Sequence, residues 1–133
     1  IKPDAVKNKY TGRVYDKIIQ AGFDIISAKL LHMTADQAKG FYDVHKERPF
    51  FNELIKFMTS GPCMVLALEK DNAVEEWRKT IGATNPNEAK KGTIRSEFAA
   101  NVQENAVHGS DSDENAQKEI AFFFSDSELL STQ

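Results

Sequence analysis

Dense apolar segments along the chain predict the strands of a sheet. Phe23–Met33 is rich in Ile, Leu and Phe, which favours a strand. Met64–Leu68 is a continuous apolar run, typical of a strand that is buried on both faces. Two shorter segments, Ile1–Asp4 and Asn105–His108, are expected as the end of one strand and as a further short strand.

Elsewhere apolar residues recur at the three- and four-residue spacing of amphipathic helices. Val14, Ile18 and Ala21 share one face of a helix that Thr11 is expected to cap and Gly22 to end. The same reasoning predicts further helices over residues 34–45, 51–58, 71–81, 94–100 and 112–123.

Polar residues at the starts of these helices predict their caps. Thr34 with Gln37 has the pattern of a capping box. Asp71 is expected to cap the helix over 71–81, and Asp111 or Ser112 the last one. The inward faces are expected to carry Ala38, Phe41 and His45; Phe51, Leu54, Ile55 and Met58; Val74, Trp77 and Ile81; and Ala116, Ile120 and Phe123.

The order of these elements predicts an α+β fold. Residues 82–92 form a polar segment, GATNPNEAKKG, that cannot pack as core and is expected as a functional loop. The predicted strands and helices alternate along the chain. This order favours a ferredoxin-like α/β sandwich with a four-stranded antiparallel sheet and additional helices. The chain is expected to form one domain over residues 1–133, with its polar tail after Ser125 at the periphery.

Composition narrows the classes of protein that remain. The 133 residues include no apolar run of 18, so a membrane span is not expected. The single cysteine, Cys63, lies in an apolar run; it is expected to be a buried core residue in a cytoplasmic protein. A net charge of −3 argues against a polynucleotide as the main ligand. The chain opens in mid-pattern at Ile1, so a few preceding residues are expected.

Familiar phosphate and metal motifs are absent from the sequence. It contains neither GxxxxGK[ST] nor GxGxxG, which excludes a P-loop and a Rossmann fingerprint. It also lacks CxxC and HExxH, and its three histidines are scattered, so no directly bound metal is predicted.

His108 is the strongest candidate for chemistry because it ends a predicted strand at NAVHGSDS. Gly109 leaves room for a turn beside the ring. Ser110 and Asp111 supply a hydroxyl and a carboxylate close by, and Glu119 on the following helix could point back, so one ring nitrogen could be held by a hydrogen bond. The other nitrogen would then be free as a nucleophile. The alternative is a structural histidine that is hydrogen bonded at a strand end. His32, which closes a predicted strand, is also interpreted as structural, and His45 as a partly exposed helix residue.

Cations at the ends of elements indicate a phosphate site, although each alone could be a solvated surface charge. These cations are Lys2, Arg48, Arg78 and Arg95. In Phe50–Phe51 only one ring can face inward at a helix start, so the other could stack on a nucleobase. Burial of both rings in the core is the alternative.

Several motifs in order and spacing resemble the nucleoside diphosphate kinase family, and bacterial members in particular. They are IKPDAV at 1–6, ERPFF at 47–51, SGP at 60–62, GATNP at 82–86, GTIR at 92–95 and NAVHGSDS at 105–112. The resemblance spans nearly the whole chain. It implies reversible transfer of the γ-phosphate from a nucleoside triphosphate, mainly ATP, to a nucleoside diphosphate, with Mg²⁺ as cofactor.

The resemblance also implies roles for individual residues. His108 would carry the phosphate, oriented by Glu119 and assisted by Ser110, with Lys2 and Tyr42 beside it. The nucleotide would be bound by Lys2, Arg48, Phe50, Leu54, Arg78, Thr84, Arg95, Val102 and Asn105.

The family forms homo-oligomers, either tetramers or hexamers. Two other functions stay open on the sequence: phosphotransfer from the histidine to another protein, and a non-catalytic binding or scaffold role.

Overall fold

A computed structural model describes residues 1–130 of the chain. Its elements, in chain order, are α1 (Pro3–Lys7), α2 (Thr11–Gln20), β1 (Asp24–Leu31), α3 (Ala35–Phe41), the 3₁₀ turn η1 (Asp43–His45), α4 (Phe51–Met58), β2 (Cys63–Glu69), α5 (Ala73–Ile81), α6 (Ile94–Phe98), α7 (Asp113–Phe123) and the 3₁₀ turn η2 (Asp126–Glu128).

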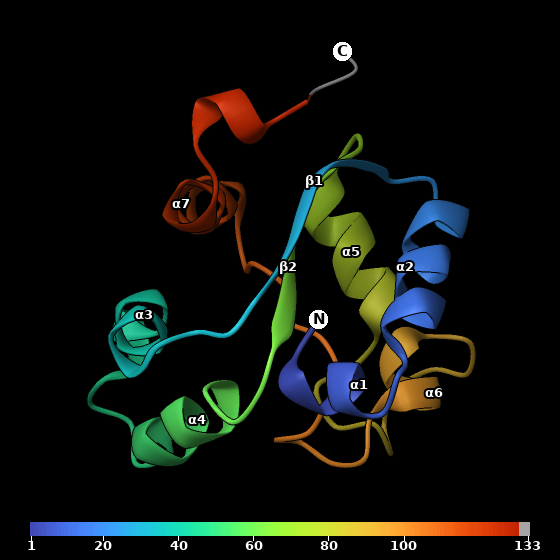
Figure 1. The fold of residues 1–133 in the computed structure, drawn as a ribbon. Helices are drawn as coiled ribbons and strands as arrows, with labels where there is room; N and C mark the ends of the chain where they lie inside the picture. The colour runs from blue at the N-terminus through green and yellow to red at the C-terminus, as the bar shows by residue number, and fades with distance from the viewer. Residues whose placement is uncertain (131–133) are drawn as a thin grey trace.

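The two long apolar segments form an antiparallel pair, which confirms both predicted strands. β1 pairs with β2 from Asp24↔Glu69 to Leu31↔Cys63, with an irregularity between Ile25 and Ser27. In Figure 1 the pair stands at the centre, with α2 and α5 on one side and α3, α4 and α7 on the other. The α+β class is therefore confirmed.

The other two expected strands are extended segments without regular strand geometry; among the described residues only β1 and β2 are strands. Ile1 exchanges two backbone hydrogen bonds with Met64 of β2, at 2.6 and 3.0 Å, and Lys2 N–H donates to Ala106 C=O at 2.8 Å. The Ile1 segment therefore lies between β2 and the segment at Ala106. Each ladder stays short because Pro3 begins α1 at once and the chain turns sharply at Ala106.

Apolar side chains gather in two clusters. The first lies among α1, α2, α5, α6 and the 106–107 segment, and it includes Val14, Ile18, Ile81 and Ile94. The second lies among α3, α4 and the start of β2, and its members are Met33, Ala38, Tyr42, Ile55, Met58 and Cys63. Cys63 is 2% exposed, which confirms it as a core residue. The three apolar residues predicted on α7 are only half-buried.

The helix starts agree with the sequence at some caps and differ at others. The Thr34–Gln37 capping box forms, and Ser112 Oγ accepts the N–H of Asn115 at 3.1 Å. Thr11 is not a cap, because Tyr10 already has helical dihedrals and its C=O accepts the N–H of Val14. The Asp71 prediction is also wrong. α5 begins after Asn72, whose left-handed conformation ends the preceding turn.

Two further predictions concern residues outside regular helices. α3 ends at Phe41, so His45 lies in η1 and does not extend the α3 face as expected. The tail after Ser125 forms η2, and Leu130 N–H donates to Ile26 C=O at 2.9 Å; the rest of that predicted tail lies outside the described residues. Over residues 1–130 no helix has the length and apolar character needed to cross a membrane.

Candidate active site

The backbone around His108 is held by side chains from distant elements. Trp77 on α5 donates its Nε1–H to the C=O of His108 at 3.1 Å. Arg95 on α6 donates to the C=O groups of Gly82, Asn105 and Val107, at 3.1, 3.4 and 2.9 Å. Because these bonds reach both sides of the turn, they fix the direction in which the histidine leaves the backbone.

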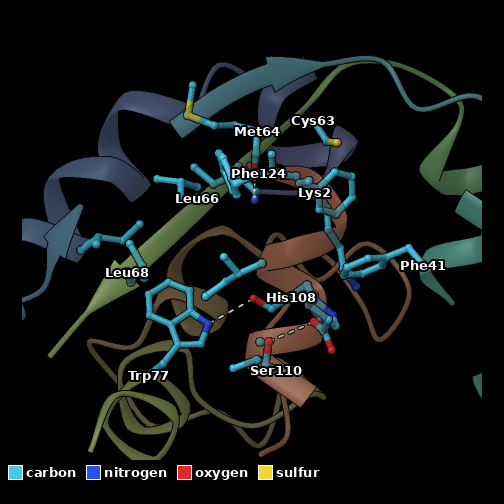
Figure 2. Close-up of a pocket in the computed structure, with 18 of the residues that line it drawn as sticks. Lys2, Phe41, Cys63, Met64, Leu66, Leu68, Trp77, His108, Ser110 and Phe124 are labelled. Carbon is cyan, nitrogen blue, oxygen red and sulfur yellow. Dashed lines mark hydrogen bonds and ion pairs between the residues drawn. The ribbon is translucent and has the colours of Figure 1, made fainter. Parts of the chain in front are cut away.

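The imidazole of His108 is oriented by a carboxylate on α7. Its Nε2 lies 2.6 Å from Oε1 of Glu119, which also accepts the hydroxyl of Ser110 at 3.0 Å. A carboxylate can only accept, so this contact places the ring proton on Nε2 and leaves Nδ1 with a free lone pair. Figure 2 shows the bond of Ser110 in this cluster and that of Trp77 to His108.

Lys2, which is half-buried, and Asn105, which is buried, form a polar pair next to the histidine. Lys2 Nζ donates to Asn105 Oδ1 at 2.8 Å, and Asn105 is 3% exposed. Burial, with a smaller contribution from Arg95, lowers the pKa of Lys2 to about 8, while Asp4 opposes the shift. Burial and then Arg78 also lower the pKa of Arg95. Positive charge is therefore concentrated here in a poorly solvated place.

Two hollows meet near Gly109, and they differ in chemistry. The one drawn in Figure 2 has a volume of about 170 Å³ and is walled mainly by apolar side chains of β2, α5 and α7, with His108 and Lys2 at one end. The other is lined mainly by cations and hydroxyls, namely Arg78, Lys79, Thr84, Lys90, Thr93 and Arg95, together with the carboxylate of Glu88. Only this cationic hollow suits the oxygens of a polyphosphate.

Two aromatic side chains pack against the ring of His108. Tyr42 and Phe41 meet the His108 ring edge-on, with centroid distances of 6.0 and 5.3 Å. The hydroxyl of Tyr42 is buried without a hydrogen-bond partner among the described residues. Burial raises the pKa of this tyrosine, and the raised pKa keeps the hydroxyl protonated as a donor.

The ring of Phe50 lies at the surface and that of Phe51 in the core, which is one of the two arrangements considered from the sequence. Phe50 is 50% exposed, whereas Phe51 packs against the second core cluster. The loop that carries Val102, itself 55% exposed, lies beside α4, since Gln103 Nε2 donates to Glu53 C=O at 3.4 Å. Leu54, the third predicted base contact, is half-buried on the same helix.

One predicted phosphate contact stands apart from the others. Arg48 is exposed on the segment before α4 and is not among the described residues that line the cationic hollow. The other predicted residues lie around His108, in the cationic hollow, or beside α4.

Sequence reasoning missed three residues that support the site. Trp77 was expected only as a core side chain, yet its ring N–H is an anchor for His108. Asp4 and Ala106 were assigned no role, although Asp4 Oδ2 accepts the N–H of Ala106 at 3.1 Å. No local pattern signals these contacts, because the partners lie 31 and 102 residues apart.

Substituting Gly109 with alanine is expected to disturb the turn under His108. A Cβ at this position would lie 2.7 Å from Cδ1 and 2.9 Å from Nε1 of Trp77, so the space is needed by the indole and not, as expected, by the imidazole. We expect a loss of about 1–3 kcal/mol in the free energy of unfolding, from overpacking. Urea unfolding and kcat measurements would test this. Gly61→Ala is the control, since its Cβ would meet nothing within 4 Å; equal stability and activity of both variants would contradict the prediction.

Lys2 is expected to make stability rise with pH in the alkaline range. Its pKa is lowered from 10.5 to about 8 in the folded chain. The unfolded chain therefore binds more protons between these values, and stability increases with pH across that window. At about 1.4 kcal/mol per pKa unit, the rise is on the order of 3–4 kcal/mol.

Urea unfolding at a series of alkaline pH values would measure this slope in the natural chain and in Lys2→Met. The methionine variant should lack the Lys2 contribution, although Asn105 Oδ1 loses its donor in it. Activity should fall over the same range, because Lys2 loses its charge. Identical slopes for the two proteins would show that Lys2 is not the group responsible.

Comparison with known proteins gives a consistent result. The family model described as nucleoside diphosphate kinase matches residues 1–129. The nucleoside diphosphate kinase of Geotalea uraniireducens is 57% identical over 130 residues, which cover 98% of this chain and 95% of that protein. That of Francisella tularensis subsp. novicida is 52% identical, covering 98% and 93%.

Solved structures agree with the sequence comparisons. The nucleoside diphosphate kinase of Aquifex aeolicus superposes with a TM-score of 0.94 at 44% identity, covering 97% of this chain and 94% of that one. The halophilic nucleoside diphosphate kinase of Halobacterium salinarum, solved in complex with CDP, also has a TM-score of 0.94, at 32% identity, covering 100% and 89%.

Proposed function

The chain belongs to the nucleoside diphosphate kinase family and has its phosphotransferase activity, and from that premise we propose that phosphorylated His108 carries the phosphate between nucleotides. A nucleoside triphosphate, mainly ATP, donates its γ-phosphate, and a second nucleoside diphosphate takes it up. The enzyme would thereby maintain the pools of nucleoside triphosphates. The contact between His108 Nε2 and Glu119 Oε1 is the observation that carries this proposal, because it leaves Nδ1 as the nucleophile.

The proposed reaction consists of two displacements at phosphorus. The Nδ1 lone pair of His108 forms a bond to the γ-phosphorus while the bond to the β–γ bridging oxygen breaks, and the nucleoside diphosphate leaves with that oxygen. The ring proton stays on Nε2, hydrogen bonded to Glu119. In the second half-reaction a terminal oxygen of another diphosphate attacks the phosphorus, and Nδ1 leaves with its lone pair. One site therefore serves both nucleotides in turn.

Cations of the site are proposed to stabilise the charge on the phosphoryl oxygens. Arg78, Thr84 and Arg95 line the cationic hollow. Lys2, which donates to Asn105 Oδ1, would contact the transferred group and the ribose hydroxyl, and Asn105 would bind the same hydroxyl. Positioned charges of this kind supply most of the help in phosphoryl transfer. Arg48 is included on its residue type and exposure alone. The Tyr42 hydroxyl would donate to a phosphoryl oxygen.

The base is proposed to bind between Phe50 and Val102, with Leu54 behind them. Stacking on an aromatic ring reads only the flat face that every base has, so low selectivity among bases is the expected consequence. The CDP complex of the Halobacterium salinarum relative supports a nucleotide as ligand.

Mg²⁺ is proposed to enter the site bound to the nucleotide. The hollow that would take the phosphates is lined mainly by arginine, lysine and threonine, with Glu88 as a single carboxylate, and such a lining suits phosphate oxygens better than a bare cation. Within residues 1–130 no group of three or more His, Cys, Asp or Glu side chains could hold a metal ion. Bound to the β- and γ-phosphates, Mg²⁺ would neutralise part of their charge.

Residues 1–133 are proposed to act as one catalytic domain of a cytoplasmic homo-oligomer, tetrameric or hexameric. The family match over residues 1–129 supports a single domain. The exposed apolar side chains Leu30 and Leu130, at 59% and 72% exposure, lie on the β1 edge or next to it and suit a subunit contact.

Labelling with γ-³²P-ATP would test the proposed carrier. The label on the protein should be lost in acid and kept in base, as expected for a phosphohistidine, and an added nucleoside diphosphate should remove it. Transfer to a candidate protein in preference to the diphosphate would support protein phosphotransfer instead. A protein that takes up no label but binds nucleotides would fit a binding or scaffold role.

A further inference from the structure

Ala106 adopts a strained backbone conformation two residues before His108. Its φ is 73°, and the N–H of Val107 donates to the C=O of Asn105 at 2.8 Å across it. This is a γ-turn with positive φ at its centre, a rare and strained form. Ala106 is fully buried and is not a glycine, so the surrounding structure must hold the turn in place.

Two residues at the start of α1 form hydrogen bonds with the backbone N–H and C=O of Ala106. Lys2 N–H donates to the C=O of Ala106 at 2.8 Å, and Asp4 Oδ2 accepts its N–H at 3.1 Å. The backbone of Ala106 is thus bonded on both sides, by residues about a hundred positions earlier in the chain.

The carboxyl group of Asp4 is costly to bury, because one of its two oxygens has no hydrogen-bond partner among the described residues. Asp4 is 8% exposed, and the oxygen in question, Oδ1, is itself buried. Burial raises the pKa of this carboxyl group. A buried polar atom without a partner destabilises the fold, and such features concentrate where function requires them.

We propose that Asp4 is a positioning residue for His108, which it aims by holding the Ala106 γ-turn through the Ala106 N–H. The carboxylate keeps the turn in its strained form, and the turn sets the direction of Val107 and then of the histidine. Arg95 and Trp77 hold the next two carbonyl groups, of Val107 and His108, whereas Asp4 holds the N–H at the centre of the turn. The proposal rests on the role of His108 proposed above.

Asp4 acts on a second group as well, because its charge faces Lys2. Asp4 raises the pKa of Lys2, whereas burial and Arg95 lower it. Several other charged and titratable groups surround Lys2. Arg95 on α6 and the ammonium of Ile1 are positively charged. The others are Cys63 on β2, Tyr42 after α3, and His108 with Glu119 across the cavity. Among all of these groups, Asp4 on α1 is the carboxylate that raises the pKa of Lys2. Its removal should therefore lower the pKa of Lys2 further.

The test compares the rate of phosphoenzyme formation with nucleotide affinity in four variants. Asp4→Ala removes the hydrogen bond and the charge, whereas Asp4→Asn removes the charge but keeps an acceptor oxygen. Asp4→Ala with Ala106→Gly gives the turn a residue that adopts positive φ freely. Asp36→Asn, an exposed carboxylate in the first turn of α3, is the matched control. Rapid-quench labelling with γ-³²P-ATP gives the rate, and a non-hydrolysable ATP analogue gives the affinity.

We expect Asp4→Ala to slow phosphoenzyme formation by about 10- to 100-fold, the range caused by small misplacements of reacting groups. Affinity for the analogue should change by less than about threefold, because the cationic hollow is untouched. The double variant should recover a substantial part of the lost rate. Asp4→Asn should keep most of the rate at neutral pH, with the alkaline limb of its pH profile moved to lower pH. The control should match the natural chain.

Three results would overturn the proposal: an unchanged labelling rate in Asp4→Ala, an equal loss of rate and affinity, or no recovery in the double variant. If Asp4→Ala does not fold, the double variant decides: a labelling rate lost together with nucleotide affinity would overturn the proposal. An unmoved alkaline limb in Asp4→Asn would contradict only the effect of Asp4 on Lys2. Failure of the underlying function is separable, because it would appear in the natural chain as a label that is not an acid-labile, base-stable phosphohistidine.

Discussion

His108→Ala is expected to fold and bind nucleotide, yet to lose turnover by on the order of 10⁴-fold or more, the scale seen when a covalent nucleophile is deleted. No other side chain near the cationic hollow can replace the Nδ1 lone pair. The fold should tolerate the change because the side chain is 35% exposed and the anchor from Trp77 reaches the backbone C=O, which alanine keeps.

The loss should appear in both half-reactions and not in binding. The variant should take up no acid-labile label from γ-³²P-ATP, while its affinity for a non-hydrolysable analogue stays within a few-fold, since Arg78, Thr84 and Arg95 remain. His32→Ala is the matched control, because His32 Nε2 contacts Thr59 C=O at 2.7 Å, on the surface at the end of α4. Acid-labile label on the His108→Ala protein would exclude His108 as the carrier.

Local signals in the sequence were sufficient for much of the fold. A capping box needs only Thr34 and Gln37, and the structure confirms it, as it confirms the Ser112 cap and the strand at Met64–Leu68. The wrong caps failed for a local reason too. Thr11 and Asp71 have suitable side chains, but the backbone conformations at Tyr10 and Asn72 set the helix starts.

The site depends on contacts that no local pattern contains. The proximity of His108 to Glu119 could be expected, because they are separated by a turn and the first turns of a helix. The bond from Trp77 to the His108 C=O and that from Asp4 to Ala106 arise only when distant elements pack together. Motif spacing supplied the residue list, whereas the orientation of the imidazole, the buried state of Lys2 and the separation of Arg48 from the hollow came from the structure.

Glu119→Gln is expected to reduce turnover by about 10²–10⁴-fold, the range seen when the carboxylate that orients a catalytic histidine is replaced by an amide. The carboxylate accepts the Nε2 proton at 2.6 Å and so favours the tautomer with a free Nδ1. A glutamine amide can turn its NH₂ toward Nε2, which would then become the acceptor and put the proton on Nδ1. Positive charge develops on the ring as Nδ1 binds phosphorus. The glutamine variant would have no negative charge next to the ring to balance it.

The choice of variants separates orientation from charge. Glu119→Asp keeps the charge on a shorter side chain, and Ser110→Ala removes only the second donor to Oε1, at 3.0 Å; both should cost less than the amide. Glu114→Gln is the control, since Glu114 lies on the same helix but points to solvent beside Lys118.

Nitrogen NMR of the labelled imidazole supplies a readout that a merely structural role would not move. In the natural chain the proton should lie on Nε2, and in Glu119→Gln the Nδ1–H form should gain population. Its share should rise as the single-turnover rate of phosphoenzyme formation falls, because only the Nε2–H form has a lone pair on Nδ1. A glutamine variant with the natural tautomer and a turnover within about threefold of the natural chain would remove Glu119 from the mechanism and leave the anchored backbone as the source of His108 orientation.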